Sequence, residues 1–207
     1  MIATTRRLGR LALVTAATCG LAWSTPTAFA GPIADKATEA ESLLSQPGDL
    51  AAFDAASASF AAATEAFEAA ADTAWAELPF QLRSAAFAES VAGFGDFTPR
   101  PNSTFHRGDT LKVYLEPVGY GFAQDASGYR IRLTAGMEIR RGDVILGKAE
   151  DFGALEWSGP NKSRTFHGEV SVTAPELKPG DYQLLLTLND AAAGKVTSAT
   201  LPFSIVE

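Results

Sequence analysis

The stretch that decides the fold is YRIRLTAGMEI, residues 129–139. Its apolar side chains recur at every second position, whereas Arg130, Arg132 and Glu138 occupy positions between them. Strict alternation over this length is typical of a β-strand with one face on a core and the other in water. The stretch therefore predicts a long strand of an antiparallel sheet, which needs partner strands elsewhere in the chain.

Partner strands are indicated by the same two-residue period on either side of this stretch. The alternating or apolar runs cover residues 111–115, 144–146, 166–172, 182–188 and 201–205. Turns rich in Gly, Pro, Asn and Asp separate them, as in antiparallel β-sandwiches. The sequence therefore predicts a sandwich of about seven strands over residues 97–207.

Two motifs near the end of the chain resemble a known family. Residues 177–184 read LKPGDYQL, and residues 201–205 read LPFSI. They look like the penultimate and last strands of immunoglobulin-like or fibronectin-III-like accessory domains of exported bacterial proteins. The resemblance implies that Tyr182 sits at the corner entering the penultimate strand and bonds back to the chain. It concerns the fold alone, excludes the cysteine-linked antibody branch, and carries no catalytic residue to this chain.

Upstream of the predicted sandwich, the apolar period is that of helices. Helix candidates cover residues 33–45, 50–78 and 80–92, with Pro47-Gly48 and Pro79 as the breaks between them. The glycines and prolines of residues 93–101 mark the change to strands. The expected fold class is α+β in separate segments, with a signal peptide over 1–30, a helical segment over 31–96 and the sandwich over 97–207.

The long helix over residues 50–78 carries a heptad stripe. Phe53, Phe60 and Phe67 recur every seven residues in an alanine-rich background. Such a stripe is the seam of a helix that packs along a partner. One interpretation is that the three helices pack on each other and on the sandwich. The other is an uncovered seam that docks another envelope protein or a second copy of the chain.

Residues 1–30 have the composition of a cleaved export signal. Arginines precede an uncharged apolar run over 11–23, and Ala28-Phe29-Ala30 offers small residues before Gly31. A run of this length is too short to span a bilayer, and we expect ordinary secretion to the periplasm or beyond. The alternatives are an uncleaved anchor, twin-arginine export through Arg6-Arg7, and a lipoprotein acylated at Cys19.

Charge and cysteine content exclude several classes of function. The formal net charge is −7, and the acids concentrate in the helical segment. An acidic chain lacks the basic footprint that nucleic acids and anionic lipids require. Cys19 is the only cysteine, so a chain cleaved after Ala30 has no disulfide and no thiolate metal site. We expect no transmembrane span after signal cleavage.

The sequence contains no recognised catalytic or cofactor motif. His106 and His167 are the only histidines, and they lack the spacing of a zinc-binding pair. Neither a nucleophile elbow nor a phosphate loop or dinucleotide fingerprint is present. We therefore expect no cofactor and no metal. The Arg-Gly-Asp tripeptides at 107–109 and 141–143 are interpreted as turns that lead into strands.

The predicted function is that of a non-enzymatic exported protein, a binding or structural module with a helical assembly segment. One alternative is a glycan-binding module, because aromatic rings beside arginines are suited to gripping a sugar. The candidate ligand surface consists of Tyr114, Tyr120, Phe122, Arg130, Arg132 and Trp157. A second alternative is a hydrolase with a carboxylate pair that no motif marks.

Overall fold

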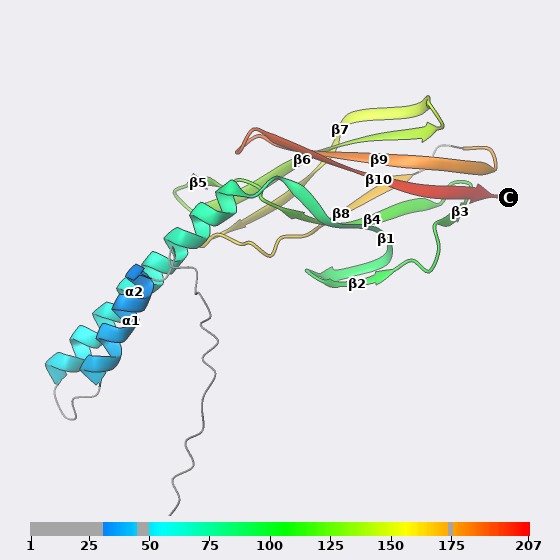
Figure 1. Cartoon of the computed structure of the whole chain (residues 1–207). Coiled ribbons are helices and arrows are strands. Elements are labelled where there is room, and N and C mark those ends of the chain that lie inside the picture. The colour runs from blue at the N-terminus through cyan, green and yellow to red at the C-terminus, as the bar shows by residue number, and fades with distance from the viewer. Residues whose placement is uncertain (1–30, 45–49, 174–175) are drawn as a thin grey trace, which may run out of the picture. The chain divides into compact units, whose positions relative to one another are not determined.

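The computed structural model describes residues 31–44, 50–173 and 176–207 (Figure 1). The predicted signal peptide and Cys19 lie outside the described residues. The chain divides into two compact units, Met1–Phe67 and Glu68–Glu207, and the division falls inside the second helix. The described residues form two helices and ten strands. These are α1 (Gly31–Leu44), α2 (Leu50–Glu77), β1 (Gln81–Gly93), β2 (Asp96–Pro99), β3 (Thr104–His106), β4 (Thr110–Val118), β5 (Ala123–Asp125), β6 (Gly128–Arg141), β7 (Val144–Gly159), β8 (Gly168–Thr173), β9 (Gly180–Asp190) and β10 (Lys195–Val206).

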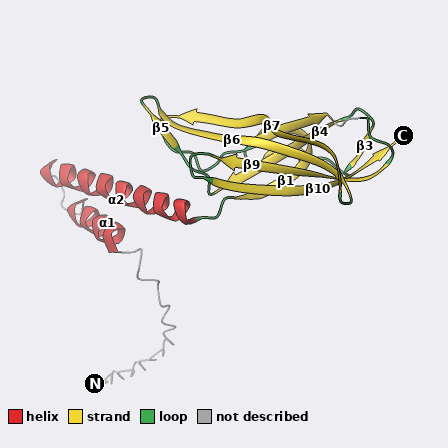
Figure 2. Cartoon of the chain, turned by 90° about the horizontal axis from the view of Figure 1, so that it is seen from above, coloured by secondary structure: helices red, strands yellow, loops and turns green. Residues whose placement is uncertain are grey.

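The strands form two sheets that face each other (Figure 2). One sheet has the order β2-β1-β4-β8, and the other has the order β3-β10-β9-β6-β5, with β7 paired to β6. Strands 1, 4 and 8 thus share a sheet, as do 6, 9 and 10, which is the A-B-E and C-F-G arrangement of immunoglobulin-like sandwiches. Three of the ten strands have only three or four residues. Of the seven longer strands, six lie within residues 97–207, where about seven were expected, and the seventh, β1, lies before that range.

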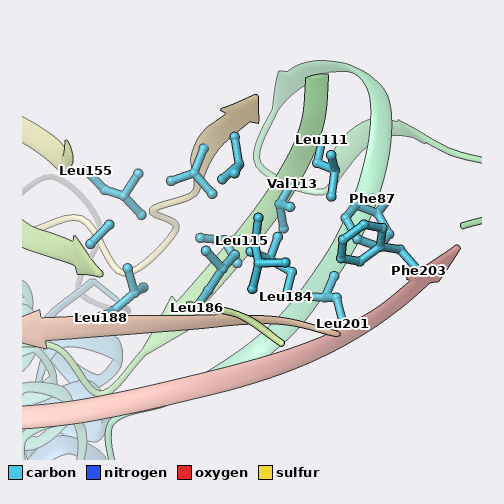
Figure 3. Close-up of a cluster of buried hydrophobic side chains, with 14 of the residues drawn as sticks. Phe87, Leu111, Val113, Leu115, Leu155, Leu184, Leu186, Leu188, Leu201 and Phe203 are labelled. Carbon is cyan, nitrogen blue, oxygen red and sulfur yellow. The ribbon is translucent and has the colours of Figure 1, made fainter. Parts of the chain in front are cut away.

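The core lies between the sheets and uses the apolar positions that the two-residue period predicts (Figure 3). The alternating residues of β4, β6, β9 and β10 are buried. They include Leu111, Val113, Leu115, Ile131, Leu133, Ile139, Leu184, Leu186, Leu188, Leu201, Phe203 and Ile205. Burying these side chains provides most of the stability of the sandwich. The described part of the chain holds no cysteine and therefore no disulfide.

The corner predicted at Tyr182 is confirmed. The Tyr182 hydroxyl donates a hydrogen bond to the Lys178 carbonyl oxygen at 2.5 Å. The ring is buried and stacks on Phe203 with 5.6 Å between centroids. The guanidinium of Arg141 covers the ring at 5.5 Å. One side chain therefore ties the entry of β9 to the loop before it and to β10.

The third predicted helix, over residues 80–92, is wrong, because this segment is strand β1. It pairs antiparallel with β4 from Gln81↔Val118 to Phe87↔Val113. Phe87 is buried in the core with its ring 5.0 Å from that of Phe105. Pairing with the β4 edge and the burial of Phe87 outweigh the helix propensity of the alanines in this stretch. The sheets therefore begin at Gln81, before the boundary expected at residue 97.

The strand character of this segment has a sequence signal in the turn that follows it. Gly95 connects β1 to β2 with a positive φ of 69°. This conformation is open to glycine and costly for other residues. The two-residue loop Phe94-Gly95, between the paired residues Gly93 and Asp96, is therefore a hairpin turn that returns the chain along β1.

Candidate binding surfaces

The phenylalanine stripe of α2 lies on the surface of its unit. Phe53, Phe60 and Phe67 retain 59%, 45% and 58% of their accessible surface. Large aromatic side chains that remain about half exposed at a regular interval are unusual for a helix of a folded unit. The protein's own helices therefore do not cover this stripe, and the interpretation that they do is wrong for the described residues.

A different stripe of α2 faces α1, which runs beside it in both views (Figures 1 and 2). Ala56, Ser59 and Ala63 are buried on α2, and Ala40 is buried on α1. Small side chains let two helix backbones approach closely, so the alanine-rich stripe makes the better contact. The phenylalanines are left about one-sixth of a turn away, pointing past α1.

The polar side chains between the phenylalanines are satisfied within the helix. The Ser57 hydroxyl donates to the Phe53 carbonyl oxygen at 3.0 Å, and the Thr64 hydroxyl donates to the Phe60 carbonyl oxygen at 3.0 Å. A partner that covers the stripe would therefore leave no stranded hydroxyl donor there. The stripe therefore combines exposed rings with hydroxyl groups whose hydrogen bonds are already made within the helix.

Acidic side chains of α2 lie away from the stripe. Asp54 and Glu65 lie about 100° to 160° around the helix from the phenylalanines, and neither forms an ion pair with any described residue. Lys36 on α1 is already paired with Glu39 at 2.8 Å. The acids of α2 in this unit therefore lie on a different face of the helix from the phenylalanines.

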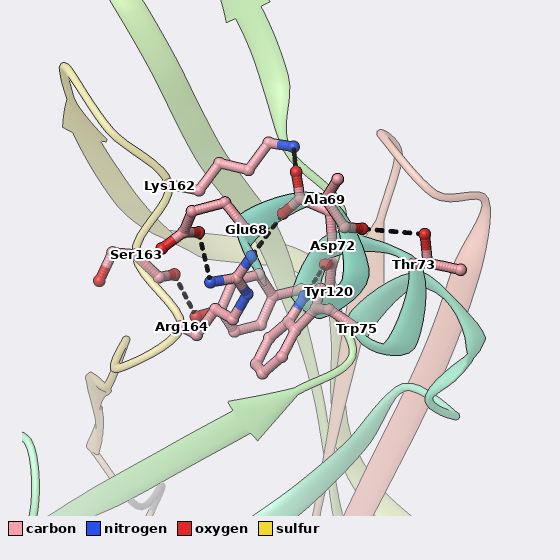
Figure 4. A network of polar contacts seen from close by, with 9 residues as sticks. All are labelled: Glu68, Ala69, Asp72, Thr73, Trp75, Tyr120, Lys162, Ser163 and Arg164. Atoms are coloured by element: carbon pink, nitrogen blue, oxygen red, sulfur yellow. Dashed lines mark hydrogen bonds and ion pairs between the residues drawn. The ribbon is translucent and has the colours of Figure 1, made fainter. Parts of the chain in front are cut away.

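The last turns of α2 belong to the unit that contains the sandwich, and they contact it through Trp75 (Figure 4). The Trp75 ring meets the Tyr120 ring edge-on, with 5.0 Å between centroids. Its indole N–H donates to the Tyr120 carbonyl oxygen at 2.7 Å. Both the apolar ring and the polar N–H of Trp75 are thus satisfied by the loop after β4.

Ion pairs accompany this aromatic contact. Asp72 accepts a hydrogen bond from the Lys162 ammonium at 2.5 Å and another from the Arg164 guanidinium. Arg164 also reaches Glu68 at 3.4 Å. The bond from Lys162, with the second from Arg164, holds the pKa of Asp72 below the ordinary aspartate value. Lys162 and Arg164, in the loop before β8, therefore bind the acidic side of α2.

Lys195 closes the C-terminus of α2. Its ammonium donates to the carbonyl oxygens of Ala76, Leu78 and Gly119 at 3.1, 3.0 and 3.2 Å. A helix C-terminus leaves carbonyl groups without partners, and a cation there satisfies them. A cavity of about 370 Å³ opens beside Lys195, Trp75 and Phe122. Because all three Lys195 donors are in use, the cavity offers no free ammonium at that point.

The candidate ligand surface predicted around Tyr114 and Tyr120 is wrong. Tyr114 points away from the core, as the alternation predicts, but the β1–β2 hairpin covers it, and Phe97 stacks on it at 4.0 Å. Its hydroxyl donates to Glu116 and accepts from the Gly95 N–H. Tyr120 is buried, and its hydroxyl donates to the Ser163 carbonyl oxygen at 2.7 Å.

Burial also sets the chemistry of Tyr120, because desolvation raises the pKa of its phenol to about 12. The hydroxyl therefore stays neutral and serves as a structural donor. Neither ring is open to a sugar face, and the glycan alternative loses two of its aromatic contacts.

The remaining members of the predicted surface do not gather on one face. Arg130 pairs with Asp125 at 2.5 Å, and Arg132 pairs with Glu156 at 3.0 Å, both on the exposed side. Trp157 lies opposite Ile131 and packs against the core, as does Phe122. The structure therefore separates the arginines from the aromatic rings expected beside them.

The hydrolase alternative requires a pair of carboxylates in a cavity. Glu138 and Glu150 both line a cavity of about 340 Å³ and both contact the Lys148 ammonium, at 3.5 and 3.2 Å. Arg140, with Lys148, holds the pKa of Glu138 below its ordinary value. A general acid needs a raised pKa instead. The charges around Glu138 thus disfavour its use as an acid catalyst.

Metal and membrane features can be stated for the described part of the chain. Within residues 31–44, 50–173 and 176–207, no three His, Cys, Asp or Glu side chains lie close enough together to hold a metal ion. Neither helix in those ranges has the length and apolar character needed to cross a membrane.

No protein-family model and no curated protein matches the sequence. Solved structures with a partial likeness include the PKD domain of an M14-like peptidase from a Thermoplasmatales archaeon, with 17% identity, a TM-score of 0.32, and coverage of 63% of this chain and 98% of that one. A CARDB domain from Pyrococcus furiosus has 9% identity, a TM-score of 0.31, and coverage of 62% and 91%. A chitin-binding domain from Burkholderia pseudomallei has 9% identity, a TM-score of 0.29, and coverage of 51% and 57%. Likenesses at these scores assign neither a ligand nor a function to this chain.

Proposed function

We propose that this protein is a non-enzymatic interaction module whose helical hairpin docks a partner protein through the stripe Phe53, Phe60 and Phe67. The observation that carries the proposal is the exposure of these three rings, each about half accessible. The export-signal pattern of residues 1–30 supports a role in the periplasm or outside the cell.

The energetics of the stripe support docking. Burying a whole phenylalanine side chain is worth about 1.5–3 kcal/mol, and these rings are about half exposed. Covering all three would contribute on the order of 3 kcal/mol before the cost of association. The satisfied hydroxyls of Ser57 and Thr64 impose no desolvation penalty in the same place.

Site-specific photo-crosslinking in cells of the source organism tests the proposal. A photoreactive phenylalanine analogue replaces Phe60 in the full chain, and in a matched variant it replaces Ala58. Ala58 is exposed and lies about 160° around the helix from Phe60. We expect a discrete adduct from position 60, repeated at positions 53 and 67, and none from position 58.

Equal adducts from positions 58 and 60, or no adduct from any of the three phenylalanine positions, would overturn the proposal. The adduct's mass distinguishes the kinds of partner. An increment equal to the chain's own mass would identify a second copy, whereas a different increment identifies another protein.

The export proposal has its own test. The intact mass of the protein recovered from the envelope and the medium should correspond to a chain that starts at Gly31. A chain starting at Cys19 with added acyl mass would replace simple cleavage with lipidation, and an unprocessed chain in the cytosol would contradict export.

A further inference from the structure

The last strand of the sandwich has a side to which no described strand is bonded over most of its length. On one side, β10 pairs with β9 over residues 195–205 (Figure 1). On the other side, β3 pairs only with residues 204–206. Between 195 and 203 this second side has no partner among the described strands. β10 therefore presents an open edge of the larger sheet.

The direction of one hydrogen bond shows which backbone groups lie on the open edge. The Ser204 N–H donates toward β3, to the carbonyl oxygen of the residue that precedes this strand, at 2.9 Å. Backbone groups of an antiparallel strand alternate in direction, with a period of two residues. The N–H and carbonyl groups of Val196, Ser198 and Thr200 therefore point outward along the same edge. Pro202 presents a carbonyl there but no N–H.

This edge lacks the features that usually keep sheet edges from pairing, which are charged residues, prolines and bulges. The other margin of the same sheet, β7, has them: charged residues that include Lys148 and Glu150, and two register shifts against β6. In contrast, residues 196–206 of β10 carry no charge, and their register with β9 has no shift. Pro202 is the one protective residue, and it leaves residues 196–200 free to pair.

Space and exposed apolar surface are present along the open edge. At one end, a cavity of about 290 Å³ is lined by Thr200 and Pro202 together with the small side chains of Ala85 and Ala86 from β1. At the other end, Val196 keeps 62% of its accessible surface. An added strand would thus cover an apolar side chain and satisfy backbone groups that only water satisfies now.

The edge is complementary to a second copy of itself. In an antiparallel pairing centred on Ser198, Val196 lies opposite Thr200 of the second copy, and each such pair exchanges two backbone hydrogen bonds. Between these pairs, Thr197 lies opposite Ala199. Small and β-branched side chains therefore meet, and no two like charges are opposed. The arrangement has the two-fold symmetry that is commonest among homo-oligomers.

We propose that two copies of the chain associate through their β10 edges, in antiparallel register about Ser198. The two six-stranded sheets then join into one continuous sheet. In this register the paired strands overlap over residues 195–201, which end before the residues 204–206 that β3 occupies. The interface belongs to the sandwich and uses none of the phenylalanines of α2.

Sedimentation velocity of the full chain over a range of concentrations tests the proposal. We expect the unmodified chain to form a dimer. Ser198→Lys and Ser198→Glu should each weaken the dimer by at least about tenfold, because position 198 meets its own copy and like charges are then opposed. An equimolar mixture of the two variants should restore the dimer, because Lys then lies opposite Glu. Restoration also shows that both variants fold.

The matched control is Gln183, an exposed residue of β9 in the same sheet. Gln183→Lys and Gln183→Glu change the net charge equally and should leave the dimer unchanged. A cysteine pair provides a second readout, because residues of a hydrogen-bonded pair lie about 5.5 Å apart, within reach of a disulfide. With Cys19→Ser as background, Ser198→Cys should give a covalent dimer on mild oxidation and Gln183→Cys should not.

Four outcomes would overturn the inference. The first is a chain that stays monomeric, and the second is a dimer that survives both Ser198→Lys and Ser198→Glu. The third is a dimer that both variants abolish and their mixture does not restore, because position 198 would then not meet its own copy. The fourth is a dimer lost in Phe60→Gln but kept in Ser198→Lys, which would place self-association on the phenylalanine stripe. For a monomeric chain, photo-crosslinking from position 198 in cells would show whether a strand of another protein occupies the edge instead.

Discussion

At the scale of single residues, hydroxyl and ammonium groups are placed where the backbone needs them. The Tyr182 hydroxyl serves the loop before β9, and Lys195 serves the end of α2. The first role was implied by the resemblance of residues 177–184 to the penultimate strand of immunoglobulin-like domains, in which a tyrosine at this corner bonds back to the chain. The sequence did not predict the second, because Lys195 meets Leu78 across 117 residues of chain.

Replacing Tyr182 with Phe should lower the free energy of unfolding by about 1 kcal/mol, because the change removes one buried hydrogen bond and strands the Lys178 carbonyl. Chemical denaturation of the full chain measures the effect. Tyr129→Phe is the control, since that hydroxyl makes no hydrogen bond in the part of the chain that the structure describes. Equal midpoints for the two variants would contradict the corner bond.

Replacing Lys195 with Met keeps most of the aliphatic stem and deletes the ammonium. We expect a loss of about 1–2 kcal/mol, since three carbonyl acceptors at the helix end lose a charged donor. Hydrogen exchange should quicken in the last turn of α2 and leave the β6–β9 ladder unchanged. Lys112→Met, which removes an exposed contact with Glu169 at 3.6 Å, should have an effect below about 0.5 kcal/mol.

At the scale of elements, periodicity predicted the long helix well but not its buried face. The expected helix over 50–78 matches α2, Leu50–Glu77. Hydrophobicity alone favours the phenylalanine stripe as the contact with α1. Close packing favours Ala56, Ser59 and Ala63 instead, because small residues let the backbones approach. The apolar period of the sequence does not show whether burying the phenylalanine rings or bringing the two helix backbones close together is more favourable.

This assignment of faces predicts opposite responses to substitution within α2. Ala56→Leu should destabilise the helical hairpin by about 1–3 kcal/mol, because a larger side chain does not fit against α1. Phe60→Gln should change its stability by less than about 0.5 kcal/mol, since the ring is exposed. Hydrogen exchange of the α1 and α2 amides measures both. A larger loss for Phe60→Gln than for Ala56→Leu would reverse the faces.

The contacts of Asp72 with Lys162 and Arg164 predict that the stability of the fold depends on pH. The pKa of Asp72 is lowered in the folded protein by the hydrogen bonds from Lys162 and Arg164. Its contribution to stability is therefore complete above the ordinary aspartate pKa of about 4 and is lost as pH falls through the lower folded value. Because Asp72 is 37% exposed, solvent screening keeps this contribution small.

Melting temperatures of wild type and Asp72→Asn between pH 2 and pH 7 test this dependence. The gap between them should be widest near pH 7 and should close in acid. Glu65→Gln is the control, because Glu65 forms no ion pair with the described residues, and its gap should be small throughout. A difference in melting temperature between wild type and Asp72→Asn that stays constant in acid would contradict the stabilising role of the Asp72 ion pairs.

At the scale of the whole molecule, the core strands of the sandwich could be predicted from the sequence, but strand β1 and the β1–β2 hairpin over Tyr114 could not. Alternation located the strands of the core because each buries one face. β1 escaped prediction because its alanines favour a helix until the β4 edge is available to pair with it. The candidate ligand surface failed for a related reason. Alternation says which way Tyr114 points, but not that Phe97 of the β1–β2 hairpin covers it.

The contacts at the end of α2 were also missed. Lys162 and Arg164 follow Gly159-Pro160, and nothing local in the sequence links them to Asp72 some ninety residues earlier. The only available sequence signal was charge complementarity, an acidic helix and a basic loop in one chain. Such a signal suggests a contact without specifying which acids and bases meet.

The most direct test of the central claim is maleimide labelling of a Phe60→Cys variant, with Cys19→Ser as background and Ala58→Cys as the matched variant. The claim is that the phenylalanine stripe is open in the isolated protein and covered by a partner in the cell. We predict equal, rapid labelling at both positions in the purified full chain, and at least about fivefold protection at position 60 alone in cells. Slow labelling of the purified Phe60→Cys variant would mean that the chain covers its own stripe, and equal labelling of both positions in cells would mean that no partner binds there. Either result would contradict the account.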